Sequence, residues 1–166
     1  GANVAFTYLS SVEKGQALEQ ELAAFGITAK GYRSDASSYT ESEKLVEDVL
    51  ADFGTIDILI NNAGISMRSL LAETEISVLK ELMNINFWGT VYCTKYALES
   101  IKAQKGVIVG VSSIAGYRGL PGRTGYSASK FAMQGFLESL RTELLHSGAH
   151  VMWVSPGFTA SNIRNV

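Results

Sequence analysis

Residues 45–64, LVEDVLADFGTIDILINNAG, decide the fold of this chain. Apolar residues recur at helical spacing from Leu45 to Phe53, and Gly54 then ends the predicted helix. An apolar strand follows at Ile56–Ile60, and the stretch closes with the polar and small residues NNAG. A helix, a glycine stop and a buried strand in this order are typical of an α/β unit.

The same alternation of strand and helix continues on both sides of this stretch. Further strands are predicted at Asn3–Tyr8, Ile27–Tyr32, Val107–Val111 and Val151–Val154. A helix is predicted from Ser10-Ser11-Val12-Glu13, which has capping-box spacing, to Gly26, and the helix that ends at Gly54 is predicted to start at Thr40. Another runs from about Thr74 to Lys102 with a bend near Asn86. A last long helix ends near Gly148 and is marked by the apolar stripe Met133, Leu137, Leu140 and Leu144. Strands that are apolar on both faces indicate a parallel sheet with helices on each side. The prediction is one doubly wound α/β domain over residues 1–166.

Three of the predicted strands end in residues that suit ligand binding. Asn62–Gly64, Ser112-Ser113 and Pro156-Gly157 each follow a strand. Ligands of open parallel sheets bind outside the carboxyl ends of the strands. We therefore expect a site at this edge of the sheet.

Tyr126 and Lys130 are four residues apart at the start of the last long helix, so their side chains share one face. A tyrosine hydroxyl has a pKa near ~10. A nearby ammonium favours the phenolate and can lower such a pKa by roughly 1–3 units, towards the range that acid–base catalysis needs. Taken alone, the pair also fits an ordinary solvated helix turn.

Composition limits the kind of protein. The chain has 166 residues, 46% hydrophobic and 18% charged, with a net charge of −2, which describes a soluble globular protein and not a nucleic-acid binder. Cys93, His146 and His150 have no partners at ligand spacing, so no metal is expected. No apolar run reaches the ~20 residues of a membrane span, and no signal-peptide pattern is present, so a cytoplasmic location without membrane partners is expected.

Five motifs together make the chain similar to the short-chain dehydrogenase/reductase family of Rossmann-fold nicotinamide enzymes. The resemblance spans essentially the whole chain, and the thirteen residues from Ser113 to Tyr126 match the family interval. The motifs are Asn61-Asn62-Ala63-Gly64, Asn86-Phe87-Trp88-Gly89, Ser112-Ser113 with Gly116, Tyr126-x-x-x-Lys130 and Pro156-Gly157.

The resemblance implies a catalytic tetrad of Asn86, Ser113, Tyr126 and Lys130. Tyr126 would exchange a proton with the substrate oxygen, and Ser113 would hold the carbonyl by a hydrogen bond. Lys130 would favour the phenolate and bind the nicotinamide ribose, while Asn86 would anchor a water that relays protons to Lys130. Two structural alternatives stay open: Asn86 as a helix bend and Ser113 as a strand-end cap.

The resemblance also implies a cofactor site. Asp35 would contact the adenine ring or act as a turn residue, and Asn61 and Asn62 would have structural or cofactor roles. The remaining implied cofactor contacts are Ala63, Gly64, Tyr126, Lys130, Pro156, Gly157 and Thr159.

The identity of the nicotinamide cofactor can be addressed at the end of the first predicted strand. An acid there would bind the adenosine ribose and repel a 2′-phosphate. The stretch Tyr8-Leu9-Ser10-Ser11 has no acid before Glu13. The hydroxyls of Ser10 and Ser11 and the free N–H groups of a helix N-terminus can accept a phosphate, so NADP is favoured over NAD.

The resemblance predicts a truncated fold. The chain begins just before the second strand of the family, so the first strand with its TGxxxGxG turn is absent, as is the last strand. The absent first strand would lie between Asn3–Tyr8 and Ile56–Ile60, which leaves a gap of roughly 10 Å. We expect the 166 residues alone to bind the cofactor weakly and to be inactive.

The predicted function is an NADP-preferring oxidoreductase that interconverts a carbonyl and a secondary alcohol. One alternative is 3-oxoacyl-(acyl carrier protein) reduction in fatty-acid synthesis, because residues 3–65 resemble the β-ketoacyl-(acyl carrier protein) reductases. Residues from Ser66 onward resemble a less specialised branch, so a recombined sequence is also open. Another alternative is a non-catalytic Rossmann domain.

Several residues are predicted on the substrate side or at an interface. The substrate-side candidates are Ile65, Ser66, Met67, Leu120 and Phe158. Arg118 and Arg123 are either solvated or positioned to meet an acidic carrier protein. The family implies a homotetramer through the helices at Asn86–Lys102 and Tyr126–His146.

Overall fold

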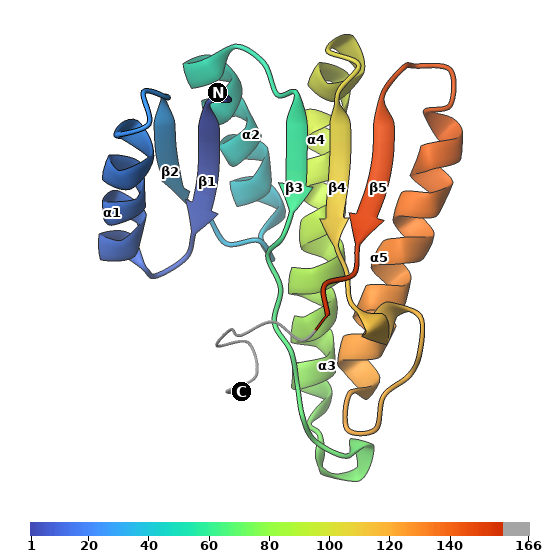
Figure 1. Ribbon diagram of the computed structural model, residues 1–166. Coiled ribbons are helices and arrows are strands. Elements are labelled where there is room, and N and C mark those ends of the chain that lie inside the picture. The colour runs from blue at the N-terminus through green and yellow to red at the C-terminus, as the bar shows by residue number, and fades with distance from the viewer. Residues whose placement is uncertain (158–166) are drawn as a thin grey trace.

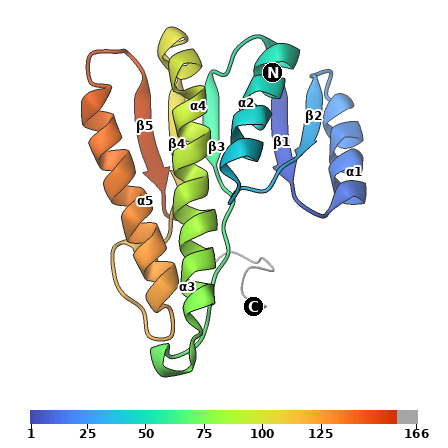
Figure 2. The same cartoon turned by 180° about the vertical axis from the view of Figure 1, so that it is seen from behind.

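Strands and helices alternate along the chain as predicted. The computed structural model describes residues 1–157. Figure 1 shows the strands with the helices beside and behind them, and Figure 2 shows the same elements from behind. The elements are β1 (Val4–Tyr8), α1 (Val12–Ala23), β2 (Ala29–Arg33), α2 (Tyr39–Phe53), β3 (Ile58–Asn61), α3 (Ile76–Leu82), α4 (Gly89–Ala103), β4 (Val107–Val111), α5 (Thr124–Glu143) and β5 (His150–Val154). Of the predicted strands, Val107–Val111 coincides with β4 residue for residue.

All described strands run parallel, but they form two separate sheets. β1 pairs with β2, while β3, β4 and β5 form a three-stranded sheet in that order. Within residues 1–157 no strand joins β1 to β3, which agrees with the predicted gap between the strands at Asn3–Tyr8 and Ile56–Ile60. None of the helices in this part of the chain is long and apolar enough to cross a membrane.

The hydrophobic core lies between the three-stranded sheet and helices α4 and α5, which cover one of its faces (Figure 2). Met133 and Leu137 of α5 and Ile108 of β4 are completely buried. The predicted stripe of α5 is therefore a core face, and each fully buried aliphatic side chain contributes roughly 1.5–3 kcal/mol of burial free energy.

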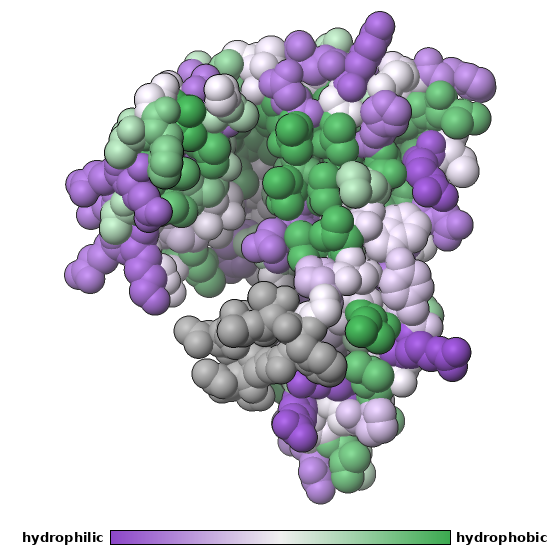
Figure 3. All heavy atoms as spheres, viewed as in Figure 1, coloured by the Kyte–Doolittle hydropathy of each residue, from purple (hydrophilic) through white to green (hydrophobic). Residues whose placement is uncertain are grey.

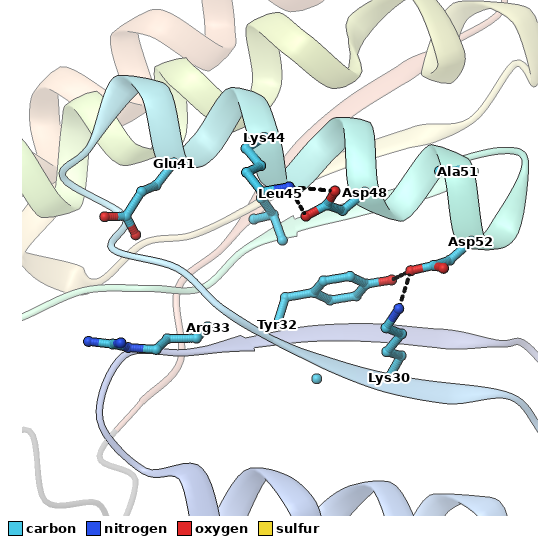
Figure 4. Close-up of a pocket in the computed structure, with 10 residues that line it drawn as sticks. Lys30, Tyr32, Arg33, Glu41, Lys44, Leu45, Asp48, Ala51 and Asp52 are labelled. Atoms are coloured by element: carbon cyan, nitrogen blue, oxygen red, sulfur yellow. Dashed lines mark hydrogen bonds and ion pairs between the residues drawn. The ribbon is translucent and has the colours of Figure 1, made fainter.

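The opposite face of this sheet is exposed in the described residues. Ile58 and Ile60 of β3 are each 59% exposed, and Met152 and Val154 of β5 are also exposed. Figure 3 shows an apolar surface over this region of the molecule. Within residues 1–157, only the β1–β2 sheet has helices on both faces, since it lies between α1 and α2 (Figure 4). The apolar pattern of a strand indicates that both faces avoid water but does not identify what covers them.

The helix starts differ from the predicted capping signals. Ser11 is the N-cap of α1, but its side chain makes no capping hydrogen bond, so the predicted capping box is wrong. Helix α2 begins earlier than expected, because the Ser38 hydroxyl accepts a hydrogen bond from the Glu41 amide at 3.3 Å. The cap is a local contact between residues three apart, and several Ser and Thr residues of this segment could provide it, so the sequence pattern alone does not select Ser38.

Candidate active site

The three predicted ligand-binding segments lie at one edge of the three-stranded sheet. Asn62–Gly64 follows β3, Ser112-Ser113 follows β4, and Pro156-Gly157 follows β5. The arrowheads of these three strands point the same way in Figure 1. The β3–β4 and β4–β5 pairings place these segments side by side. The parallel register thus collects residues that are far apart in the sequence.

Lys130 is a buried cation at this edge. Its side chain extends from α5, and the ammonium Nζ donates a 2.8 Å hydrogen bond to the carbonyl oxygen of Val111, the last residue of β4. Among residues 1–157 no carboxylate pairs with it. Burial lowers the pKa of Lys130 to about 8. A lysine held in this way keeps ammonium protons free for a ligand.

Tyr126 lies in the first turn of α5, half-buried and on the same helix face as Lys130, as predicted. The Lys130 Nζ atom is 5.9 Å from the centroid of the Tyr126 ring. Within the described residues the Tyr126 hydroxyl has no hydrogen-bond partner, so its oxygen is available to a ligand.

Ser113 follows β4 in an extended conformation, with φ −162° and ψ 163°. Its Oγ accepts a hydrogen bond from the Ala115 amide at 3.2 Å. The serine therefore caps the short 3₁₀ turn at Ile114–Gly116. Because the hydroxyl acts as an acceptor in this cap, its proton remains available for donation to a substrate oxygen.

Ser112 has a different role from its neighbour. It is buried, and its Oγ accepts a 2.8 Å hydrogen bond from the Gln134 side chain of α5. Gly116 lies against this pair, since a Cβ there would be 2.5 Å from Gln134 Nε2. The glycine lets the loop after β4 approach α5 closely, which explains why Gly116 accompanies the serine pair.

Asn86 is completely buried in a π-helical turn, Met83–Trp88, between α3 and α4. This turn corresponds to the predicted bend, and such turns are frequent at functional sites. The amide Oδ1 accepts from the Ile65 amide at 2.8 Å, and Nδ2 donates to the Ile65 carbonyl at 3.0 Å and to Ser129 Oγ at 2.9 Å. The side chain thus fastens the loop after β3 to α5.

Gly64 marks the point where these groups converge. A Cβ at Gly64 would lie 3.2 Å from Asn86 Oδ1 and 3.5 Å from Lys130 Nζ. Asn86 and Lys130 are therefore near neighbours, although no hydrogen bond joins them within residues 1–157. A proton relay between them stays a prediction.

Two of the predicted cofactor residues have structural contacts. Asn61 is buried, and its side chain donates to Thr94 of α4 at 3.1 Å, which ties β3 to that helix. One carboxylate oxygen of Asp35 accepts from the Ser37 amide at 2.8 Å and from its hydroxyl at 2.7 Å, which is the predicted turn role. These contacts leave a cofactor role for either residue a prediction.

The other predicted cofactor residues lie on the surface at the carboxyl ends of the strands. Ser10 and Ser11 are exposed between β1 and α1, and Asn62 and Ala63 are exposed after β3. Pro156 and Gly157 are exposed after β5, whereas Phe158 and Thr159 lie outside the described residues.

Two residues that the sequence did not single out, Ser129 and Arg33, have contacts near the predicted site residues, and so does Arg123, which was predicted to be solvated or to meet a carrier protein. Ser129 is fully buried and its hydroxyl donates to the Tyr126 carbonyl at 2.8 Å while accepting from Asn86. Arg33, at the end of β2, donates through Nε to the Leu9 carbonyl at 3.2 Å. Arg123 donates to the Ser66 hydroxyl. The position of Arg33 beside a strand end was a usable signal, but the contacts of the other two depend on tertiary packing.

A pocket of about 450 Å³ lies away from this edge, between β2 and α2 (Figure 4). Asp52 accepts hydrogen bonds there from Tyr32 at 2.6 Å and from Lys30 at 2.5 Å. Burial, together with Asp52, raises the pKa of Tyr32 well above its usual value. None of the predicted catalytic residues lines this pocket, so we do not assign it to the chemistry.

Comparison with known proteins identifies the family. The sequence matches the short chain dehydrogenase family over residues 1–166. It is 30% identical to the 3-oxoacyl-[acyl-carrier-protein] reductase FabG of Staphylococcus epidermidis over 166 residues, which are 99% of this chain and 68% of the relative. It is 37% identical to the dehydrogenase/reductase SDR family member 7B of Rattus norvegicus, over 93% of this chain and 45% of that protein.

Solved structures of other proteins have the same fold. A blue fluorescent protein from a metagenomic library, solved in complex with NADPH, superposes with a TM-score of 0.92 at 32% identity, over 98% of this chain and 67% of that one. This likeness confirms the predicted Rossmann-like α/β fold. The chain spans about two thirds of the length of the reductase and of this solved structure. The chain belongs to the short chain dehydrogenase family of oxidoreductases.

Proposed function

We propose that this chain forms most of an NADP-preferring oxidoreductase that interconverts a carbonyl and a secondary alcohol. The observation that carries the proposal is the buried Lys130 ammonium, which has no carboxylate partner in residues 1–157 and lies 5.9 Å from the ring of Tyr126 at the ligand-binding edge of the sheet. A structural lysine would gain an acidic partner at such a depth, because an unpaired buried charge is costly.

Three side chains would carry out the steps that the protein contributes. Tyr126 gives its proton to the carbonyl oxygen as that oxygen becomes negative, and takes it back in the reverse direction. Ser113 donates a hydrogen bond to the same oxygen. The Lys130 charge favours the phenolate of Tyr126, and its free ammonium protons bind ribose hydroxyls of the cofactor.

Asn86 acts at a distance from the substrate in this proposal. Its bonds to Ile65 and Ser129 fix the loop after β3 and the first turn of α5. We propose in addition that it anchors a water that supplies protons to Lys130. The nicotinamide, when bound, supplies or accepts the hydride.

Cofactor preference rests on the ends of β1 and β2. Ser10 and Ser11 are exposed beside the N-terminus of α1, and no acid precedes Glu13. The Arg33 guanidinium is held at the Leu9 carbonyl and forms no ion pair within residues 1–157, so its terminal amino groups can meet a 2′-phosphate. We therefore favour NADP over NAD, with adenine contacts at Asp35 and nicotinamide contacts at Pro156, Gly157 and Thr159.

A second candidate function is reduction of a 3-oxoacyl thioester on an acyl carrier protein. The similarity to the Staphylococcus epidermidis reductase over 99% of this chain favours it. We also propose a homo-oligomer, because Trp88 beside α4 and Phe131 of α5 are exposed on the helices that the family is expected to use for assembly. A cytoplasmic location is a separate part of this proposal.

Replacement of Tyr126 by Phe in the full-length protein tests the proposal against a non-catalytic Rossmann domain. The hydroxyl is the only group lost, so we expect NADPH-dependent carbonyl reduction to fall by about 10²–10⁴-fold while NADPH still binds. Tyr117→Phe is the matched control, since Tyr117 is exposed and its hydroxyl contacts Trp153 instead of the site. Unchanged turnover in Tyr126→Phe rejects the assignment.

A further inference from the structure

Arg123 lies beside the ring of Tyr126 and is held there from two directions. Its guanidinium carbon is 6.0 Å from the ring centroid, and Nη1 donates a hydrogen bond to the buried Ser66 hydroxyl in the loop after β3. The Arg123 backbone carbonyl accepts from the Ser127 amide at 2.7 Å, which anchors the residue at the start of α5. The side chain is half-buried and ordered by these contacts, unlike a solvated loop arginine.

No carboxylate of residues 1–157 forms an ion pair with Arg123. The ion pairs of residues 1–157 join Lys30 to Asp52, Lys44 to Asp48 and Lys102 to Glu99. The two segments that frame Tyr126, residues 62–72 and 112–125, contain Arg68, Arg118 and Arg123 and no Asp or Glu. A local excess of positive charge in a chain of net charge −2 attracts anions to this region.

We propose, on the basis of the function proposed above, that Arg123 binds a carboxylate carried by the carbonyl substrate itself. The substrate class is then the oxo acids and the corresponding hydroxy acids. A guanidinium binds a carboxylate through two parallel N–H donors. Arg123 uses only one of its terminal amino groups for Ser66, so the N–H groups of its other nitrogens remain for a carboxylate. The carboxylate lies within a few bonds of the carbonyl, because the guanidinium is 6.0 Å from the ring whose hydroxyl serves that carbonyl.

The position of Arg123 favours a small substrate over the acidic surface of a carrier protein. Arg68 and Arg118 are exposed, whereas Arg123 is half-buried and contacts a side chain of the site. A macromolecule would meet the exposed arginines first. A small carboxylate reaches the guanidinium while its carbonyl lies at Tyr126 and Ser113.

The test compares 4-oxopentanoate with its methyl ester, which has the same ketone and no charge, in NADPH-dependent reduction by the full-length protein. We expect kcat/KM for the acid to exceed that for the ester by roughly tenfold or more, as expected for a charged hydrogen bond. Arg123→Gln brings the ratio close to one, and Arg123→Lys restores part of it. Arg118→Gln removes an equal charge from the same loop and changes the ratio less than about twofold.

The outcomes separate this inference from the proposed function. The carboxylate site is overturned if the wild type reduces both ketones with an acid-to-ester ratio of kcat/KM near one, or if Arg123→Gln keeps the wild-type ratio. Either result leaves the oxidoreductase assignment intact. If Arg123→Gln loses kcat/KM only for acyl-carrier thioesters, the carboxylate site is overturned in favour of carrier docking. Absence of NADPH-dependent turnover of any ketone rejects the proposed function and this inference with it.

Discussion

The ammonium of Lys130 donates a 2.8 Å hydrogen bond to the carbonyl oxygen of Val111, which joins α5 to the carboxyl end of β4. This single contact places a cation at the edge where the loops after β3, β4 and β5 meet. The site therefore exists only when α5 is docked on the sheet, so binding and folding are coupled there.

Burial of Lys130 makes stability depend on pH. The folded-state pKa of about 8 lies below the ordinary value of 10.5, so the unfolded chain binds more protons between these two values, and the free energy of unfolding rises with pH in that window. The full rise is roughly 3 kcal/mol. Lys130→Met removes it, whereas exposed Lys95→Met keeps it. Urea unfolding at pH 7.5 and 9.5 measures the difference, and an equal rise in both variants contradicts this account.

Asn86 stabilises the loop after β3. Replacement by Ala removes three hydrogen bonds, and it leaves the buried Ser129 hydroxyl and both partly buried polar groups of the Ile65 backbone without them. We expect a loss of about 2–4 kcal/mol in the free energy of unfolding. Asn84→Ala is the matched control, because Asn84 is exposed in the same π-helical turn. Chemical denaturation of both variants measures this, and equal losses would mean that the side-chain bonds of Asn86 add no stability.

The close approach at Gly116 predicts a steric effect. In Gly116→Ala the new methyl group would lie 2.5 Å from Gln134 Nε2 and 2.8 Å from Ser112 Oγ, so the variant should lose about 1–3 kcal/mol of stability. The double variant with Gln134→Ala should recover part of the loss, because the clashing side chain is shortened. Gly119→Ala serves as the control, since no atom lies within 4 Å of its added Cβ. Thermal melting detects these differences, and a neutral Gly116→Ala would contradict the steric explanation.

Arg33 should contribute to cofactor preference in the full-length protein. Arg33→Gln removes the charge held at the Leu9 carbonyl, so we expect the NADPH-to-NADH ratio of kcat/KM to fall roughly tenfold. Arg141→Gln is a control at a position away from the proposed phosphate contact, because Arg141 lies over the ring of Trp153. An unchanged ratio in Arg33→Gln would place the 2′-phosphate elsewhere.

The 166 residues expressed alone should bind NADPH weakly and show no turnover. β1 and β3 are not paired with each other, and Ile58 and Ile60 expose apolar surface that a complete doubly wound fold would cover. Fluorescence titration with NADPH and a reductase assay, run beside the full-length protein, check this. Equal affinity and turnover in the two proteins would show that the segment is sufficient.

The sequence by itself determined the order of strands and helices, the parallel arrangement and the shared helix face of Tyr126 and Lys130. These features follow from local periodicity and from residues one helical turn apart, and both are visible in a linear pattern. The same local reasoning placed Ser113 at a strand end, where the structure has it.

Only the tertiary structure decided which partner each polar side chain takes. Asn86 contacts Ile65 and Ser129, which lie 21 and 43 residues away in the sequence, and Lys130 contacts Val111, which lies 19 residues away. Such pairs form because burial removes water from each polar group, which then bonds to the nearest partner that packing supplies. The pattern of one strand or helix carries no record of that partner, so the contacts of Arg123 and the exposed face of the sheet became visible only in three dimensions.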